Sequence, residues 1–226
     1  MSSGSIRMND RTDNTAIVTE TPLLETLEQC FSAQATATEQ WHVRTPDESA
    51  CSSQNFPENL PDLVLAQHLC NFLLWHVEDT ARRKDVPDSI IVECKRRVDK
   101  LNQMRNDAME EVDRRLCLLL EPLMPPSPSP RRNTETVGMA VDRLSILALK
   151  IYHMEEQTRR GDAEEEHIRN CSEKLRVLQE QRQALVLAVM DLIRDYLRGY
   201  KSPALYAQMK MYNDPSLNPE LYNPAK

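Results

Sequence analysis

Apolar residues in the segment 168–196 recur every three or four positions, which is the spacing of one face of a long helix. The stripe consists of Ile168, Cys171, Leu175, Leu178, Leu185, Val189, Leu192 and Tyr196. Arg182 stands where this spacing requires another apolar residue. Because a guanidinium group cannot lose its proton, burying it requires carboxylates, amides or an anionic ligand nearby. The pattern therefore predicts a helix with a polar contact on its buried face.

A second stripe, in the segment 91–116, is interrupted in the same way by Arg105. Its apolar members are Ile91, Cys94, Val98, Leu101, Met109, Val112 and Leu116. Two inward-facing arginines predict a polar pocket inside a helical bundle. The expected partners of these arginines are Glu78, Asp79, Asn102 and Asp142.

Proline, glycine and capping residues mark where the helices begin and end. Pro61 and Pro87 favour helix starts, because proline fits the first turn of a helix. Gly161 indicates a turn, Asp162 is the expected N-cap of the next helix, and Gly199 is placed to end that helix. The expected long helices are 61–83, 88–121, 135–159 and 162–199.

The predicted fold class is all-α: a helical bundle of four long helices with a short N-terminal helix and an irregular C-terminal strap. The expected organisation is a disordered tail at 1–20, a short helix (Pro22 to Phe31) and loop within 21–59, a bundle domain at 60–200 with a proline-rich linker at 122–130, and a strap at 201–226. The strap carries Tyr206 and Tyr222 among turn-forming residues. We expect it to bury its apolar groups across the first and third long helices, near His76 and His153.

Composition agrees with helices and narrows the partners. Four glycines and 5% aromatic residues favour helix over sheet. A net charge of −7 and a pI near 5.3 argue against nucleic-acid binding. The six cysteines show no metal-ligand spacing and are expected to be free thiols. Because no signal peptide or membrane span is indicated, we expect a cytoplasmic protein.

Polar side chains gather on two of the expected helices. On the third, Asp142, Lys150 and His153 share one sector, which indicates either a binding site or a solvated face. On the first, His76 and Asp79 stand three residues apart, so the carboxylate could orient the imidazole. A core histidine whose hydrogen bonds are satisfied is the alternative.

Further polar residues surround the two arginines. Asn102 supplies an amide near Arg105, and the loop 131–136 precedes the third helix, where it can cap that helix or, with a nearby arginine, hold an anion. The candidate ligand-binding residues are His76, Asp79, Asn102, Arg105, Glu135, Asp142, Arg143, Lys150, His153 and Arg182.

The pair Glu164 and His167 has the spacing of helical di-iron proteins, but such sites need two pairs and two further glutamates. The sequence contains no phosphate-binding loop, serine-nucleophile motif or dinucleotide fingerprint. We therefore expect no metal site and no cofactor.

Several strings together resemble a bacterial family catalogued only as a domain of unknown function. They are Trp75-His-Val-Glu-Asp79, Lys95-Arg-Arg-Val-Asp-Lys-Leu-Asn-Gln103, Asn133-Thr-Glu-Thr136, Asp142-Arg-Leu-Ser-Ile-Leu-Ala-Leu-Lys-Ile-Tyr-His-Met154 and Lys210-Met-Tyr-Asn-Asp-Pro-Ser-Leu-Asn218. The resemblance extends from Leu63 to Tyr222. Members of this family are often encoded beside lipopolysaccharide-type glycosyltransferases, so the resemblance implies a link to envelope-glycan assembly.

Two classes of function fit these observations. The first is a binding or accessory protein, with an anionic small molecule or a glycosyltransferase as its partner. The second is a small enzyme that acts on a phosphate-bearing or nucleotide-sugar substrate. In the enzyme, His76 or His153 would be the general acid or base, and Arg105, Arg143 and Lys150 would hold the charge. Binding is favoured, because the chain supplies cations more clearly than it supplies a nucleophile.

Overall fold

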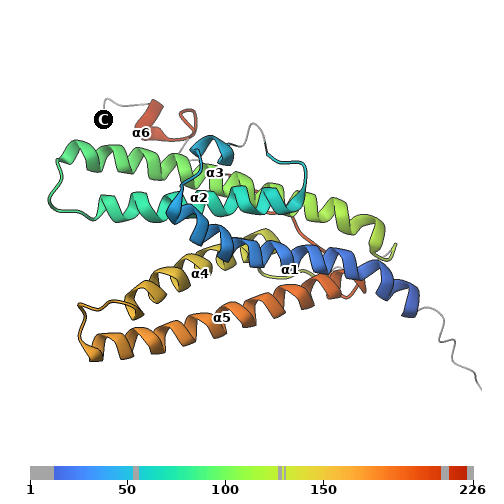
Figure 1. The fold of residues 1–226 in the computed structure, drawn as a ribbon. Helices are drawn as coiled ribbons and strands as arrows, with labels where there is room; N and C mark the ends of the chain where they lie inside the picture. The colour runs from blue at the N-terminus through green and yellow to red at the C-terminus, as the bar shows by residue number, and fades with distance from the viewer. Residues whose placement is uncertain (1–12, 53–55, 127–128, 130, 210–213, 223–226) are drawn as a thin grey trace, which may run out of the picture.

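The protein is a bundle of long helices in the computed structural model, which describes residues 13–52, 56–126, 129, 131–209 and 214–222 (Figure 1). The long helices are α1 (Asp13–Val43), α2 (Leu60–Ala81), α3 (Asp88–Leu120), α4 (Val137–Thr158) and α5 (Glu165–Leu197). The short ones are η1 (Glu48–Cys51), η3 (Glu121–Leu123) and α6 (Pro219–Tyr222). These ranges contain no strand, so the all-α expectation is confirmed. None of the described helices is both long and apolar enough to cross a membrane.

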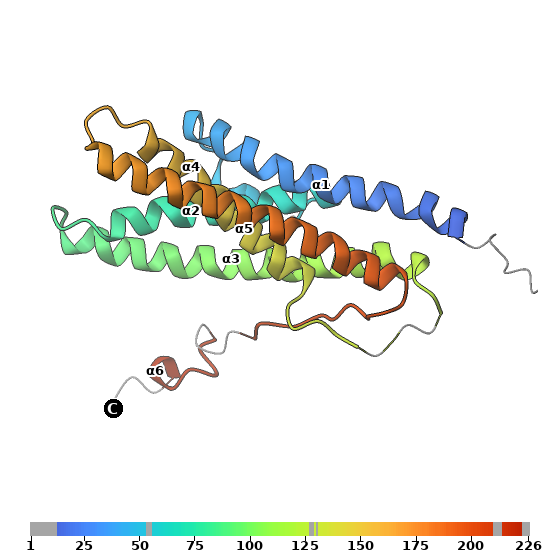
Figure 2. The same cartoon turned by 90° about the horizontal axis from the view of Figure 1, so that it is seen from below.

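Two helical hairpins make up most of the bundle. α2 and α3 pack along each other, as do α4 and α5, and α4 also contacts both helices of the first hairpin. α1 lies across the two hairpins and contacts α2, α4 and α5 (Figures 1 and 2). This arrangement places the last turns of α1 against α2 and α4.

The core consists of two apolar clusters with buried polar groups where they meet. One cluster joins the N-terminal parts of α2 and α4 to the C-terminal parts of α3 and α5. The other joins the rest of α2 to the N-terminal half of α3. On α2, for example, Val64 belongs to the first cluster and Leu69 to the second, and the fully buried Gln67 and His68 lie between them. Since buried polar groups need hydrogen-bond partners, these positions predict a network between helices.

The N-terminal helix is much longer than the predicted segment from Pro22 to Phe31. α1 has 31 residues and begins at Asp13, so it overlaps positions 13–20 of the expected tail, while residues 1–12 lie outside the described part. Between Phe31 and Trp41 the helix has no bulky apolar residue, but alanine, glutamine and glutamate are good helix formers. Its buried face continues with Gln34, Ala37 and Thr38. Because this buried face is polar, the spacing of apolar residues does not predict the second half of the helix.

The other helix boundaries lie close to their predicted positions, with one exception. α5 begins at Glu165 rather than at an N-cap Asp162, because the Asp162 carboxylate pairs with Arg160 at 2.7 Å. Gly199 ends α5 as predicted, with a φ of 71° that favours glycine. Ser129 of the linker lies at this end, and its amide donates to the Gly199 carbonyl at 2.8 Å.

The C-terminal strap does not cover the histidines. The Gln208 amide donates to Glu110 of α3 at 2.7 Å, and α6 lies on the α3 side of the bundle, with α1 on the opposite side (Figure 2). Leu217 and Tyr222 are 49% and 59% exposed, so the predicted burial is wrong for these two residues. The physical reason is local, because the Asp214 side chain accepts hydrogen bonds from its own turn.

Candidate functional site: three converging histidines

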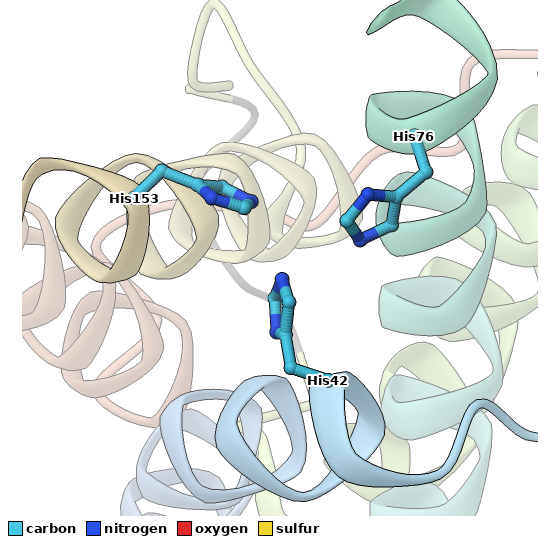
Figure 3. Close-up of side chains that lie close together, drawn as sticks. All are labelled: His42, His76 and His153. Carbon is cyan, nitrogen blue, oxygen red and sulfur yellow. The ribbon is translucent and has the colours of Figure 1, made fainter. Parts of the chain in front are cut away.

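Three histidines from three helices bring their imidazole rings together. His42 lies in the last turn of α1, His76 in α2 and His153 in α4. Figure 3 shows the three rings converging on a common space. One ring nitrogen from each lies within 4.8 Å of those of the other two, and all three residues are half-buried. We call these three residues the histidine site.

Aromatic side chains hold two of the rings from behind. Tyr152 stacks on His42 with 4.0 Å between ring centroids, and Trp75 stacks on His153 with 4.7 Å. The ring of Phe72 meets His42 edge to face at 4.9 Å. Such packing restricts rotation of the imidazoles, so the site is largely preorganised.

His42 presents a nitrogen lone pair to the centre of the site. Its Nδ1 lies 2.7 Å from the carbonyl oxygen of Thr38, one turn earlier in α1. A carbonyl can only accept, so Nδ1 carries the hydrogen and Nε2 keeps its lone pair. The Nε2 atom is buried and has no hydrogen-bond partner among the described residues.

His153 has the same arrangement with a carboxylate in place of the carbonyl. Its Nδ1 lies 2.7 Å from Oε2 of Glu156, which is three residues later in α4. An ionised carboxylate also only accepts, so this contact again assigns the hydrogen to Nδ1. The Nε2 atom of His153 is buried and lacks a partner among the described residues. Two of the three imidazoles thus aim unused acceptors inward.

His76 completes the group and connects it to a cavity. Burial lowers the pKa of His76, and the neighbouring His42 and His153 lower it further, which favours the neutral imidazole. A cavity of about 370 Å³ reaches His76, with Glu93 and Arg97 of α3 in its walls. A small molecule in this cavity would therefore contact one member of the histidine site.

The donor set suits a transition-metal ion. Zinc binds imidazole nitrogen at about 2.0–2.1 Å, which separates the nitrogens of a tetrahedral site by about 3.4 Å. The present limit of 4.8 Å is wider, so binding would have to bring the nitrogens closer by up to about 1.4 Å. A hydrogen bond from the second ring nitrogen to a carbonyl or carboxylate is the usual support of a metal-bound histidine. No metal site was expected from the sequence, where neither the cysteines nor Glu164 and His167 form a complete ligand set. Spacing along the chain does not reveal a group of three histidines that are far apart in the sequence.

Asp142 and Arg105 are both predicted site residues, and they contact each other between α4 and α3, Asp142 buried and Arg105 half-buried. The Arg105 Nε lies 3.5 Å from Oδ1 of Asp142, so Arg105 turns inward toward one of its expected partners. The same oxygen accepts from the amide groups of Gln67 at 2.5 Å and Asn71 at 2.8 Å. Burial raises the pKa of Asp142, and these three partners act in the opposite direction.

Arg182, the other interrupting arginine, is also half-buried but meets a backbone group. Its guanidinium donates to the carbonyl oxygen of Phe31 on α1. Burial lowers the pKa of Arg182, since no carboxylate offsets the desolvation. A side-chain carboxylate or amide was expected as its partner, and none is found among its described contacts. The partner is a backbone carbonyl of α1, a helix that was not expected to lie beside α5.

The remaining predicted site residues do not join the histidine site. Asp79 is exposed and acts on His76 through its charge alone, whereas the expected hydrogen bond does not form between them. Arg143 pairs with Glu135 at 2.7 Å on the surface. Lys150 is exposed on α4. Asn102 is half-buried on α3, and Glu78 pairs with Arg82 at 3.1 Å instead of with an inward arginine.

The loop before α4 caps that helix. The Thr136 hydroxyl accepts from the Met139 amide at 3.2 Å, and the Gly138 amide donates to Asp113 at 2.6 Å. The sequence left two alternatives for this helix N-terminus, a cap or a bound anion. The Asp113 carboxylate occupies the place where an anion would bind. The capping alternative is therefore the one that the structure supports.

His42 is the residue of the histidine site that sequence reasoning missed. A signal for it existed, because positions 31, 34, 38 and 42 repeat at helical spacing. Gln34 and Thr38 are polar, and so the stripe was not recognised as a buried face. For the same reason Thr38, whose carbonyl orients His42, was not predicted to belong to the site.

Comparison with known proteins places the chain in a family without an assigned activity. No curated protein and no solved structure matches it. The family model described as "Protein of unknown function (DUF4254)" matches residues 61–204, from the first turn of α2 to beyond the end of α5. His76 and His153 lie within this match, and His42 precedes it. Since the match covers more than half of the chain, the protein belongs to this family of unknown function, DUF4254.

Proposed function

We propose that the protein binds one divalent transition-metal ion of the zinc class through His42, His76 and His153. The observation that carries the proposal is the pair of buried Nε2 atoms on His42 and His153, each oriented by a hydrogen bond at Nδ1. A buried acceptor without a partner costs about 1–3 kcal/mol. A metal ion among the three rings would satisfy both acceptors at once.

A purely structural cluster of aromatic rings accounts for less of the geometry. Stacking explains why Tyr152 and Trp75 pack against His42 and His153. It does not explain why both imidazoles leave a buried Nε2 without a hydrogen-bond partner among the described residues. Metal ligation requires the neutral ring with a free nitrogen, and the lowered pKa of His76 favours this form as well.

The ligand types indicate which ions fit. Imidazole suits zinc, copper, iron and nickel, whereas magnesium and calcium prefer oxygen ligands. The six cysteines are free, and none belongs to the histidine site. Three protein ligands also leave one tetrahedral position for water or an exogenous ligand, as in catalytic zinc sites.

The cationic clamp considered from the sequence plays no part in this proposal. Arg105 is directed at Asp142, and Arg143 is paired with Glu135, so neither is available to hold an anion without losing its partner. A role beside glycosyltransferases rests on the family resemblance alone. The metal site is therefore the function that the contacts support best.

Metal titration of the full-length protein tests the proposal. We expect wild-type protein to bind one equivalent of Zn²⁺ or Co²⁺ in equilibrium dialysis, and Co²⁺ to give the visible absorption of a nitrogen-ligated site. His42→Ala, His76→Ala and His153→Ala should each weaken binding at least about tenfold, since a three-ligand site loses a direct bond.

His167→Ala is the matched control. His167 is exposed on α5 and belongs to no group of metal ligands in the described chain, so this variant should bind like the wild type. If the three site variants retain the affinity of the control, the metal proposal is wrong.

A further inference from the structure

A buried hydrogen-bond network connects the histidine site to the centre of the bundle. It runs from Asp142 and Ser145 on α4, through Asn71 and His68 on α2, to Thr38 on α1. All five residues are at most 6% exposed. The network ends at the residue whose carbonyl orients His42. It therefore joins three helices at the point where the site is assembled.

The hydrogens at the α1 end can be assigned from the contacts. The Thr38 hydroxyl lies 2.9 Å from the Gln34 carbonyl, which can only accept, so the hydroxyl donates its single hydrogen there. The same oxygen lies 3.0 Å from Nε2 of His68 and must accept from it. If Thr38 donated to His68 instead, two lone-pair oxygens would face each other at 2.9 Å. His68 therefore carries its hydrogen on Nε2.

The assignment continues without conflict to the carboxylate. With the hydrogen on Nε2, the Nδ1 of His68 accepts from the Ser145 hydroxyl at 2.7 Å. The Ser145 oxygen in turn accepts from the Asn71 amide at 2.9 Å, and the second hydrogen of this amide goes to Asp142 at 2.8 Å. In each of these hydrogen bonds the donor and the acceptor are thus assigned. The network therefore has a single direction of hydrogen bonding.

His68 is suited to this fixed role because it stays neutral. It is fully buried, and burial lowers its pKa to about 3, although the Gln34 carbonyl acts in the opposite direction. A neutral imidazole has one donor and one acceptor, which are the two functions that Thr38 and Ser145 require.

We propose that Thr38 and His68 are positioning residues, which hold the end of α1 so that His42 directs its Nε2 lone pair at His76 and His153. Thr38 connects the two systems, since its hydroxyl binds His68 and its carbonyl binds His42. The inference rests on the proposed metal function for its purpose, while the tautomers themselves can be measured without metal. Substitution of the residues that hydrogen-bond to metal-bound histidines typically lowers metal affinity by about 10- to 100-fold.

The test compares Thr38→Val, Thr38→Ser and Thr36→Val in the full-length protein. Valine removes the hydroxyl at nearly constant shape, and serine retains it. Thr36 lies on the exposed side of the same helix, so Thr36→Val controls for the substitution itself. The readouts are the histidine tautomers from ¹⁵N NMR of metal-free protein, and the affinity and absorption spectrum of bound Co²⁺.

We expect wild-type His42 to carry its hydrogen on Nδ1 and His68 to carry its hydrogen on Nε2. Thr38→Val should weaken Co²⁺ binding at least about tenfold and shift the absorption band, whereas Thr38→Ser and Thr36→Val should stay within about threefold of wild type. A merely structural role would lower the melting temperature of Thr38→Val and leave the spectrum of saturated protein unchanged.

Three results would overturn the proposal. The first is either wild-type histidine in the opposite tautomer, which refutes the network whatever the metal result. The second is a Thr38→Val variant with the affinity and spectrum of Thr36→Val, which refutes the positioning role and leaves metal binding intact. The third is a wild type that binds no Co²⁺ together with unchanged His42 signals in Thr38→Val, which refutes both proposals.

A second variant keeps the test decisive if Thr38→Val does not fold. Ser145→Ala breaks the network on α4 by removing the hydroxyl that donates to His68. We expect His68 to keep its hydrogen on Nε2, because Thr38 still accepts it, while its Nδ1 loses the donor and the Co²⁺ affinity falls. An affinity equal to that of wild type, or a hydrogen on Nδ1, contradicts the proposal.

Discussion

Asp113 is a buried carboxylate whose charge state should control stability near neutral pH. It is 7% exposed on α3 and accepts the Gly138 amide at 2.6 Å. Burial raises its pKa from 3.8 to about 6, although the hydrogen bonds from Thr136 and Gly138 oppose this shift. The folded protein therefore binds a proton more tightly than the unfolded chain. The resulting stability is complete below pH 3.8 and is lost as the pH rises through about 6.

Replacing Asp113 with asparagine should remove this pH dependence and keep the acceptor for Gly138. Relative to wild type, we expect Asp113→Asn to gain up to about 3 kcal/mol between pH 4 and pH 7. Urea unfolding across this range measures the difference. Asp191→Asn, an exposed carboxylate on α5, should show a nearly constant difference. A constant difference for Asp113→Asn would contradict the assignment.

At the same scale, sequence reasoning located part of the candidate site. His76 was selected because Asp79 lies one turn away, and His153 because it shares a helix sector with Asp142 and Lys150. Both belong to the histidine site. Arg105 was predicted to turn inward toward carboxylates or amides, and it lies opposite Asp142. Their convergence with His42 was not predictable from one helix at a time, because it depends on how α1 crosses α2 and α4.

At the scale of elements, the contact between α3 and α4 depends on a glycine. A Cβ atom on Gly138 would overlap the carbonyl oxygen of Met109 and lie 2.8 Å from Oδ2 of Asp113. The close approach lets the first turn of α4 donate to the Asp113 carboxylate. The reason for glycine is space between two helices, which the sequence pattern of either helix does not reveal.

Gly138→Ala should therefore push α4 away from α3 and destabilise the fold by about 1–3 kcal/mol, the usual cost of overpacking. Chemical denaturation measures this loss. Gly161→Ala is the matched control, since a Cβ at Gly161 meets no atom within 4 Å. Equal stability of the two variants would show that the helices separate without cost.

Helix boundaries were predictable where turn formers and apolar stripes agree. The predicted starts of α2 and α3 at Pro61 and Pro87 and the end of α5 at Gly199 lie within about two residues of those observed, which is the ordinary uncertainty of helix ends. The end of α1 was not predictable in this way. Its second half buries Gln34, Ala37 and Thr38 where large apolar residues are usually found. The unusual composition of that face reflects the polar network, which is a tertiary feature.

At the scale of the whole molecule, the proposed metal site combines two parts of the chain. The family match at 61–204 contains both hairpins and two of the histidines. α1 precedes this match, yet it supplies His42 and buries Leu27 and Phe31 in the core. The four-helix prediction was therefore sound for the hairpins, and it was incomplete because the fifth long helix is part of both the core and the site.

The C-terminal segment, unlike α1, is largely exposed and should contribute little to stability. Its described side chains at Leu217, Leu221 and Tyr222 are about half exposed, and its hydrogen bonds from Ser216 and Glu220 are local. Exposed apolar groups gain little from folding, because burial is the source of their stabilisation. A chain that ends at Met209 keeps the contact between Gln208 and α3.

We therefore expect the shortened chain to melt within about 2 °C of the full-length protein, which corresponds to less than about 1 kcal/mol for a chain of this size. Its Co²⁺ affinity should also be unchanged. α6 lies on the α3 side of the bundle, with α1 on the opposite side (Figure 2), and the three histidines come from α1, α2 and α4. Phe31→Ala, which empties a fully buried position, provides the contrast and should cost about 3–5 kcal/mol. A drop of more than about 5 °C on truncation would show that the segment packs against the bundle.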